Sequence, residues 1–522
     1  AAGVPVDALQ LLHGTGETIG AALVAQPGVA GVVFTGSTQV AKIIQRALAA
    51  KEGAIVPLIA ETGGINAMVV DSSALPEQVV DAVGMSAFRS AGQRCSALRL
   101  LCVHESIADG VIEMVQGAAR ELKAGDPSDL ATDVGPVIDQ EAFDNIQRQI
   151  QRLRREAKVV VQPDAASASA MPNLIAPHAF EVKSIAEVTS EIFGPVLQIV
   201  RWSGDPSDVV AQINALGYGL TFGIQTRIDS RAQALAHAAH IGNVYINRNM
   251  IGAVVGVQPF GGEGLSGTGP KAGGPLYLYR LLQADEAQGN PALSALAASS
   301  ACRLLVPAGS ERQPMEPASL QALAQLQDSL RGLALVAPLG ELSHFEAVQA
   351  TAVCDAYLAG SVLGQTFRLP GPTGESNRYQ LLPRGAVWLV PQTALGLLNQ
   401  LAAALASGNH CWLETPAADS ALARMLKSLP PEVRAFVSLC SAGQWQNASH
   451  LSALLFEGDG DALQTLSLQL AQRDGAIVRI ESLSPAQLAA GAHYDLSALM
   501  HEQSISTNTA AAGGNAQLMT MG

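Results

Sequence analysis

The sequence predicts an α/β protein, and three observations support this class. Between residues 62 and about 250, apolar runs of strand length alternate with longer segments of helical period, which is typical of a mostly parallel sheet with crossover helices. The same alternation returns between about 300 and 495. Apolar residues make up 48% of the 522 residues and aromatic residues only 4%, so we expect a core of Ala, Val, Leu and Ile.

The first predicted strand covers residues 31–34 and runs into the turn Thr35-Gly36-Ser37. A segment of helical period follows at 40–46. A strand, a small-residue turn and a helix start together present free backbone N–H groups, which can bind a phosphate. The alternative for this turn is an ordinary helix cap without a ligand.

The following strands are expected at residues 66–71, 98–104 and 158–162, and a helix is expected at 105–122. Farther along, the most apolar stretch of the chain covers 386–406. It is interrupted by the polar or helix-breaking residues Pro391, Gln392, Asn399 and Gln400. We therefore interpret it as a buried strand and helix, not as a membrane span.

Charge and cysteine content exclude several classes of protein. The 31 basic and 45 acidic residues give a net charge of −14 without a basic run, which argues against binding to nucleic acid. The six cysteines show neither a CxxC spacing nor a paired framework, so we expect no metal site and no disulfide scaffold. They are Cys95, Cys102, Cys302, Cys354, Cys411 and Cys440. A reducing cytoplasm fits this pattern best.

Glu61 and Cys95 form the most informative pair. The first lies in Glu61-Thr-Gly-Gly64 and the second in Gly92-Gln-Arg-Cys-Ser96, and the small residues around each would let a substrate approach the backbone. A thiol nucleophile with a carboxylate base suits covalent acyl chemistry, in which water later releases the acyl group. The alternatives are a buried structural thiol and a surface carboxylate.

Two further motifs follow this pair, Glu191-Ile-Phe-Gly-Pro-Val196 and Gln258-Pro-Phe-Gly-Gly262. Together with the Gly36-Ser37 turn and the Glu61–Cys95 pair, and in this order, they resemble the aldehyde dehydrogenase superfamily over residues 1 to about 285. The resemblance implies an incomplete Rossmann-type NAD domain plus a catalytic α/β domain. It implies Cys95 as nucleophile and Glu61 as base, Gly36 and Ser37 at the pyrophosphate, Glu191 at the nicotinamide ribose and Phe193 near the nicotinamide. NAD is the expected cofactor, with NADP left open.

Three segments narrow the resemblance: Arg94-Cys-Ser-Ala97, residues 251–262 and residues 504–515. They look like the proline utilization A enzymes, bacterial bifunctional proteins that join a flavin-dependent proline dehydrogenase to an L-glutamate-γ-semialdehyde dehydrogenase. The resemblance implies that Ser96, Gly252 and Ala253 bind the substrate carboxylate and that Phe260 lines its aliphatic chain. FAD is expected only in an N-terminal part outside this chain.

The region 301–500 resembles the first cofactor-binding strands of the same superfamily, but its functional positions differ. Pro391-Gln-Thr-Ala394 stands where the superfamily has Pro-Trp-Asn-Phe, and Thr415-Pro416 stands where it has Lys-Pro. We expect a degenerate aldehyde-dehydrogenase-like domain that binds no cofactor and is retained for packing. The alternative is that it supplies a missing cofactor half.

The expected organisation has six parts. They are 1–61, the second half of an NAD-binding domain whose first half is missing; 62–250, the catalytic domain; 251–285, a return segment with the substrate-anchor loop; 286–300, a linker; 301–500, the degenerate domain; and 501–522, a tail that docks on the catalytic module. The superfamily's oxyanion Asn and ribose-binding Lys have no counterpart before Phe34, so we expect a longer polypeptide.

The sequence therefore predicts NAD-dependent oxidation of L-glutamate-γ-semialdehyde to L-glutamate in a cytoplasmic bacterial enzyme. We expect a homodimer or covalent continuation into a proline dehydrogenase domain, and peripheral membrane association through a missing flavin domain stays open. The alternatives are a dehydrogenase for another semialdehyde, an inactive structural partner, and a thiol esterase that uses only Cys95 and Glu61.

Overall fold

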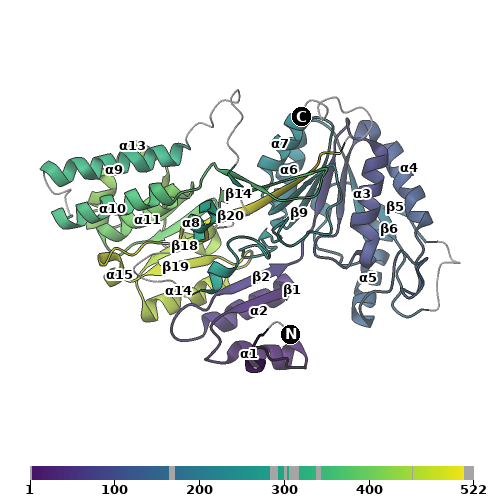
Figure 1. The fold of residues 1–522 in the computed structure, drawn as a ribbon, viewed down its shortest axis with the longest axis horizontal. Coiled ribbons are helices and arrows are strands. Elements are labelled where there is room, and N and C mark those ends of the chain that lie inside the picture. The colour runs from purple at the N-terminus through teal and green to yellow at the C-terminus, as the bar shows by residue number, and fades with distance from the viewer. Residues whose placement is uncertain are drawn as a thin grey trace.

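The computed structural model describes residues 3–163, 171–282, 292–298, 303–304, 317–336, 342–448 and 451–510. Figure 1 shows two lobes, one built from the elements β3 to α7 and the other from α9 to β19, with the strands β14 and β20 passing between them. A small N-terminal unit lies beneath the two lobes (Figure 1). Cys302 and residues 511–522 of the predicted tail lie outside the described residues.

The N-terminal unit contains a two-stranded parallel sheet, β1 (Val32–Gly36) and β2 (Leu58–Thr62), joined by helix α2 (Thr38–Ala49). Ser37 caps α2, because its side chain accepts a hydrogen bond from the N–H of Val40. The short helix α1 (Ala21–Ala25) precedes this sheet. The predicted strand, turn and helix start at residues 31–46 are therefore confirmed.

The lobe from β3 to α7 carries Cys95, and we call it the catalytic lobe after the role predicted for that residue. It contains most of an eleven-stranded sheet, in the order β12-β13-β14-β20-β10-β9-β3-β4-β7-β6-β5. Its own strands are β3 (Ala67–Val70), β4 (Leu100–His104), β5 (Lys158–Val161), β6 (His178–Glu181), β7 (Val196–Trp202), β9 (Thr221–Gln225) and β10 (Asn243–Ile246). The helices are α3 (Pro76–Phe88), α4 (Glu105–Glu121), α5 (Gln140–Glu156), α6 (Pro206–Ala215) and α7 (Asp229–Ala238). The strands and the helix expected between residues 66 and 162 are confirmed, and β3, β4, β7 and β9 pair in parallel.

The C-terminal lobe has a five-stranded parallel sheet in the order β17-β16-β15-β18-β19. These strands are β15 (Ala386–Val390), β16 (His410–Glu414), β17 (Val437–Cys440), β18 (Leu451–Glu457) and β19 (Arg479–Leu483). Its helices are α9 (Ala318–Val336), α10 (His344–Gly360), α11 (Ala394–Ala406), α12 (Ala421–Ser428), α13 (Pro431–Arg434), α14 (Gly460–Gln472) and α15 (Pro485–Ala489). β15 and the fully buried α11 confirm the strand and helix predicted at 386–406. Among the described helices, none has the length and apolar character to span a bilayer.

Two strands from beyond residue 370 complete the sheet of the catalytic lobe. β20 (Met500–Asn508) lies parallel to β10, with Asn243 opposite Ser504, and β14 (Glu375–Pro383) lies antiparallel to β20. The short strands β12 (Arg303–Leu304) and β13 (Thr366–Leu369) continue the same sheet. The C-terminal half therefore contributes β12, β13, β14 and β20 to the sheet of the catalytic lobe, in addition to its own five-stranded sheet.

Residues 292–298 were expected to belong to a linker, but they form helix α8. Leu293 and Leu296 are buried in the core of the C-terminal lobe, together with Leu323 and Leu326 of α9. The run of Ala, Ser and Leu that suggested a linker is also compatible with a helix, because Ala and Leu have high helix propensity. The burial of Leu293 and Leu296 in this core decides between the two.

Candidate active site

The segment before Cys95 has an unusual backbone. Ser90, Ala91 and Gly92 have positive φ angles of 55°, 53° and 64°. Non-glycine residues seldom adopt this conformation, and they do so mainly where surrounding structure imposes it, often at functional sites. At Gly92 a side chain is excluded altogether, because a Cβ atom there would overlap the carbonyl group of Gly194.

Asn66, at the start of β3, holds the nucleophile loop. Its side-chain N–H group donates to the carbonyl oxygens of Cys95 and Ala97 at 2.6 and 2.9 Å, and its side-chain oxygen accepts from the N–H of Thr221 at 3.1 Å. Asn66 is buried, so these bonds are shielded from water. The main chain at Cys95 is thereby fixed to the centre of the sheet.

Arg99 is a second residue that organises this loop, and the sequence analysis did not single it out. Its guanidinium is fully buried and donates to the carbonyl oxygens of Gly92 (2.6 Å), Gly194 (3.2 Å) and Arg94 (3.1 Å). It also forms an ion pair with Glu191 at 3.3 Å. An arginine inside the apolar run 98–104 is the signal that could have identified it, since a buried charge requires partners.

Glu61 lies on β2 against the loop that contains Gly261 and Gly262. Its Oε2 atom accepts a hydrogen bond from the N–H of Gly262 at 3.1 Å, whereas Oε1 is buried and has no partner among the described residues. A Cβ atom on Gly261 would stand only 2.8 Å from Oε1, so the glycine is needed for this close approach. Burial raises the pKa of Glu61 to about 8, although Gly262 and the ammonium of Lys271 act in the opposite direction.

The thiol of Cys95 is coupled electrostatically to two carboxylates. Burial raises its pKa, and the negative charges of Glu61 and Glu191 raise it further. The backbone N–H groups of Ser96 and Cys95 lower it, but they do not outweigh the other effects. These protein groups together therefore disfavour the thiolate.

The residues predicted to bind the cofactor lie on two elements. Glu191 and Phe193 are adjacent to the nucleophile loop, and the Phe193 ring is 42% exposed with the Arg99 guanidinium 5.2 Å from its centre. Gly36 and Ser37 are exposed at the N-terminus of α2 in the N-terminal unit. Gly63 has no room for a side chain, because a Cβ atom there would overlap the carboxylate of Glu191. An exposed aromatic ring, a carboxylate and an open helix N-terminus fit a nicotinamide, a ribose and a pyrophosphate.

The segments that contain the residues predicted to bind the substrate are hydrogen-bonded to Ser86, near the end of α3. Ser86 accepts from the N–H of Met250 at 3.0 Å through its hydroxyl and from the N–H of Leu98 at 3.0 Å through its carbonyl. The first bond fixes the start of the loop containing Gly252 and Ala253, and the second fixes the end of the segment containing Cys95 and Ser96. Ser96 is buried, and Phe260 is half-buried and bridges to Ala272.

The N–H groups of Gly252 and Ala253 have no acceptor among the described residues, and Gly252 has a φ of 78° that favours glycine. Two adjacent N–H groups of this kind can bind a carboxylate. This site needs no buried cation.

Lys271 was near these motifs in the sequence but was assigned no role. It is buried, and its ammonium donates to the side-chain oxygen of Asn243 at 2.8 Å and to the carbonyl of Gly261 at 2.6 Å. Its backbone N–H donates to Glu502 of β20 at 2.6 Å. Lys271 therefore connects the glycines beside Glu61 to the last strand of the chain.

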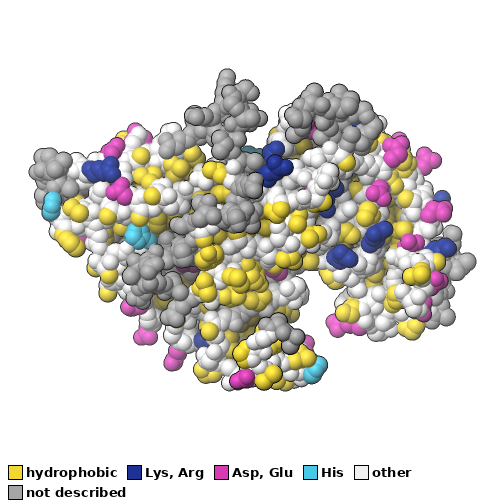
Figure 2. All heavy atoms as spheres, viewed as in Figure 1, with side chains coloured by type: hydrophobic (Ala, Val, Ile, Leu, Met, Phe, Trp, Pro, Cys, Tyr) yellow, Lys and Arg dark blue, Asp and Glu magenta, His cyan; other side chains and the backbone are white. Residues whose placement is uncertain are grey.

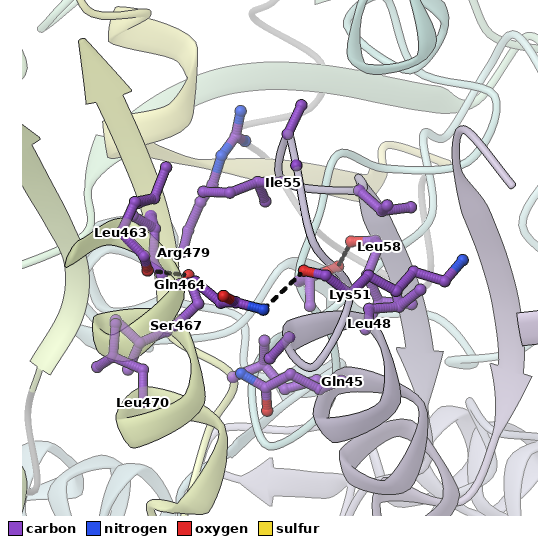
Figure 3. Close-up of a pocket in the computed structure, with 18 of the residues that line it drawn as sticks. Gln45, Leu48, Lys51, Ile55, Leu58, Leu463, Gln464, Ser467, Leu470 and Arg479 are labelled. Atoms are coloured by element: carbon purple, nitrogen blue, oxygen red, sulfur yellow. Dashed lines mark hydrogen bonds between the residues drawn. The ribbon is translucent and has the colours of Figure 1, made fainter. Parts of the chain in front are cut away.

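A groove lies apart from these residues, where the N-terminal unit meets the C-terminal lobe. Figure 3 shows it between Leu48 and Lys51 of the N-terminal unit and Gln464 and Leu470 of α14. Gln464 donates to the carbonyl of Lys51 at 3.5 Å across it. None of the predicted site residues lines this groove, so it does not belong to the candidate active site.

In the C-terminal lobe, the N-terminus of α11 is occupied by a carboxylate of the protein itself. Glu457 is fully buried, and it accepts from the N–H groups of Gln392 and Thr393 at 2.6 and 2.8 Å and from the Thr393 hydroxyl at 2.7 Å. A Cβ atom on Gly396 would overlap this carboxylate. The position where a helix N-terminus could bind a phosphate is thus already filled by a negative charge.

Comparison with known proteins places this geometry in context. The aldehyde dehydrogenase family matches residues 1–285. The bifunctional protein PutA of Escherichia coli K12 is 46% identical over 532 aligned residues, which cover 100% of this chain and 38% of that protein. The 1-pyrroline-5-carboxylate dehydrogenase of Geobacillus kaustophilus is 37% identical over 288 residues, 54% of this chain and 55% of that enzyme. A crystal structure of Bradyrhizobium japonicum proline utilization A, a D779W mutant, is 59% identical over 53% of this chain and 28% of its own, with a TM-score of 0.52.

Proposed function

Because the chain belongs to the aldehyde dehydrogenase family, we propose that it performs NAD-dependent oxidation of L-glutamate-γ-semialdehyde to L-glutamate as one half of a bifunctional enzyme of proline catabolism. The observation that carries this proposal is the Cys95 loop, which Asn66 and Arg99 hold in place and which Arg99 links to Glu191. The PutA and 1-pyrroline-5-carboxylate dehydrogenase relatives support the choice of substrate. The chain spans only 38% of the length of the PutA relative.

Cys95 and Glu61 act in successive steps of the reaction. The thiol of Cys95 releases its proton to water and its sulfur forms a bond to the aldehyde carbon, while the backbone N–H of Cys95 stabilises the oxyanion that develops. NAD, when bound, accepts the hydride from that carbon. Glu61 then takes a proton from water as the water attacks the resulting thioester. The carbon–sulfur bond breaks, the acid leaves, and the thiol recovers its proton.

The residues present fit the nicotinamide part of NAD. Glu191 would accept hydrogen bonds from the ribose hydroxyls, Phe193 would pack near the nicotinamide, and Gly36 and Ser37 would face the pyrophosphate at the N-terminus of α2. Arg99 supports this arrangement, because its ion pair keeps Glu191 beside the Cys95 loop. FAD belongs to this proposal only as the cofactor of a proline dehydrogenase region outside this chain.

The substrate would be held at both ends. Its far carboxylate accepts from the free N–H groups of Gly252 and Ala253 and from the hydroxyl of Ser96, and Phe260 lines the aliphatic chain between. The aldehyde carbon is then presented to Cys95. An anion site made of backbone donors suits a protein with a net charge of −14, because it needs no additional cation.

We assign a non-catalytic role to the region 301–500. The carboxylate of Glu457 at the N-terminus of α11 would repel a phosphate, which supports a domain that binds no cofactor. The domain boundaries at residues 61, 250, 285, 300 and 500 remain part of the proposal.

The N-terminal unit exposes large apolar side chains, and Figure 2 shows a group of them at its surface. They include Val33, Val40 and Ile43, which are 55%, 42% and 59% exposed. An exposed apolar surface of this kind is typical of a contact with further protein. It supports a longer polypeptide or a dimer partner.

The test uses the complete polypeptide that contains this chain, with NADH formation from glutamate semialdehyde as the readout. We expect Cys95→Ala to abolish NADH formation, whereas Cys440→Ala, a change of a buried thiol in the C-terminal lobe, should leave it unchanged. A wild-type protein that binds NAD but forms no NADH would contradict the proposal and leave a structural partner. Equal turnover of a semialdehyde without the far carboxylate would contradict the choice of substrate.

A further inference from the structure

Glu375, the first residue of β14, reaches from the C-terminal part of the chain into the catalytic lobe. One of its carboxylate oxygens accepts a hydrogen bond and ion pair from Arg248, and the other accepts from the side-chain amide of Gln258. Asn377 on the same strand donates to that second oxygen at 2.9 Å. The side chains of Arg248 and Glu375 are only 16% and 14% exposed, so the pair is largely shielded from solvent.

Gln258 transmits this contact to the substrate-anchor loop. Its side-chain oxygen accepts from the backbone N–H of Val254 at 2.9 Å, while its N–H group faces Glu375 and, at 3.5 Å, Asn377. A carboxylate can only accept, so Glu375 fixes which end of the amide faces Val254. Gln258 is 4% exposed, and water therefore cannot readily replace either partner.

The loop has few other restraints. Val254 and Val255 are 55% and 84% exposed, and Gly252 and Gly256 both have positive φ angles. The N–H groups of Val257 and Gln258 donate to the carbonyl of Val254, so the bond from Val254 to the Gln258 side chain closes the turn on its other side. The free N–H groups of Gly252 and Ala253 lie immediately before this turn, and its conformation sets where they point.

Glu375 also balances the charge of Arg248, which would otherwise be a partly buried cation near the anchor loop. Arg248 has further partners in the hydroxyl of Ser506 at 2.8 Å and the ring of Tyr245, whose centre lies 5.4 Å from the guanidinium carbon. The contacts with Glu375 and Ser506 direct Arg248 toward β14 and β20. The carboxylate of a substrate is thereby left to the backbone donors of the loop.

We propose that Glu375 is a positioning residue of the aldehyde site, through which the C-terminal half sets the affinity of the catalytic half for the carboxylate end of its substrate. Glu375 holds Gln258, Gln258 holds Val254, and Val254 orients the donors of Gly252 and Ala253. The proposal rests on the proposed function, since it concerns the substrate of that reaction. It concerns binding and leaves the chemistry at Cys95 unchanged.

The experiment compares Glu375→Gln with Glu375→Asp and with the matched control Arg378→Gln in the complete polypeptide. Arg378 lies on the same strand and is exposed, and its guanidinium donates to the side-chain oxygen of Gln233 at 3.4 Å. Steady-state kinetics are measured with glutamate semialdehyde and with propanal, which has no carboxylate. We expect Glu375→Gln to raise KM for the semialdehyde about tenfold, the usual effect of losing a hydrogen bond to a charged group. KM for propanal and both kcat values should stay within about twofold, and Asp should restore part of the affinity.

A parallel rise of KM for both aldehydes, or no rise for either, would overturn the proposal. If Glu375→Gln does not fold, Gln258→Met serves instead, because it breaks the link to Val254 and keeps the pair of Glu375 with Arg248. We expect Gln258→Met likewise to raise KM for the semialdehyde and to leave KM for propanal unchanged. A wild-type protein that does not oxidise the semialdehyde would remove the proposed function together with this inference, whereas an active wild type with an unchanged variant would remove the inference alone.

Discussion

The guanidinium of Arg99 lies 3.3 Å from the carboxylate of Glu191 and donates to the carbonyl of Gly92 in the loop that precedes the nucleophile. One buried side chain thus connects the nucleophile loop with the segment proposed to hold the nicotinamide ribose. Because the arginine uses backbone carbonyls for most of its bonds, the loop geometry and the carboxylate position depend on each other.

Replacing Arg99 with Met should therefore destabilise the protein strongly. The change leaves Glu191 buried without its counter-ion and three carbonyl groups without their donor, and we expect the free energy of unfolding to fall by about 3–5 kcal/mol. Chemical denaturation measures this loss. Arg201→Met is the matched control, since Arg201 forms partly exposed ion pairs with Glu181 and Asp109 that should contribute only about 0–1 kcal/mol. Equal losses in the two variants would contradict the role given to Arg99.

Replacing Glu61 with Gln should remove the base for thioester hydrolysis. We expect kcat to fall by about 10²–10⁴-fold, the usual contribution of general base catalysis. Only the deprotonated carboxylate can accept a proton from water, so wild-type kcat should rise as the pH passes through about 8, the pKa of Glu61. The variant should lose this rise. A normal burst of NADH followed by slow turnover would place the defect in hydrolysis, and loss of the burst would contradict this assignment.

The same pKa predicts a pH dependence of stability. An unfolded glutamate has a pKa near 4.5, and burial raises that of Glu61 to about 8. Between these values the folded protein holds a proton that the unfolded chain has released, so the contribution of Glu61 to stability is present below pH 4.5 and is lost as the pH rises toward 8. Glu61→Gln should therefore gain stability relative to the wild type across this window, as thermal melts at several pH values would show. A constant difference between the two proteins would contradict the shift.

Replacing Lys271 with Met should move the pH profile of turnover. The ammonium of Lys271 lowers the pKa of Glu61, so its removal should raise that pKa and displace the rise in kcat to higher pH. At neutral pH we expect kcat to fall about tenfold, the effect of one pKa unit on the population of the base. Lys42→Met controls for the loss of a buried lysine, because Lys42 lies in α2 and interacts with Arg46, Arg473 and Asp474. A profile that moves equally in both variants would contradict the pairing of Lys271 with Glu61.

Replacing Gly92 with Ala should disturb the nucleophile loop. The added Cβ atom would overlap the carbonyl of Gly194, and the positive φ of 64° is unfavourable for alanine, with a cost of about 1–3 kcal/mol. We expect lower stability and lower kcat. Gly117→Ala is the control, because Gly117 lies in α4 with open space around it and should gain about 0.5–1 kcal/mol. An unchanged kcat in Gly92→Ala would show that the loop tolerates the shift.

Local patterns sufficed for much of the fold. The strand at 31–36, the strands from 66 to 162 and the strand and helix at 386–406 each carry a period or an apolar run that depends on near neighbours. The helix at 292–298 could not be predicted from such a pattern, since only its burial in the core of the C-terminal lobe distinguishes it from a linker.

Residues of the candidate site could be predicted from the sequence where a motif carries the chemistry, as at Glu61 and Cys95. The roles of these two residues remain predictions. The supporting residues Asn66, Arg99 and Lys271 act through contacts with segments far away in the sequence. Asn66, for instance, bonds to Thr221, and no spacing rule connects the two. Glu375 and Gln258 are also brought together only by the pairing of β14 with β20.

The pairing of β20 with β10 has a consequence for how the protein is made. Asn243 is synthesised long before its partner Ser504. Until the last part of the chain has left the ribosome, the sheet of the catalytic lobe keeps an open edge at β10, and an open edge can pair with other chains. Closing it requires a contact between distant parts of the sequence, which is slow to form. A stop codon shortly before residue 500 would therefore damage the catalytic lobe first, although every residue proposed for its chemistry would already have been synthesised.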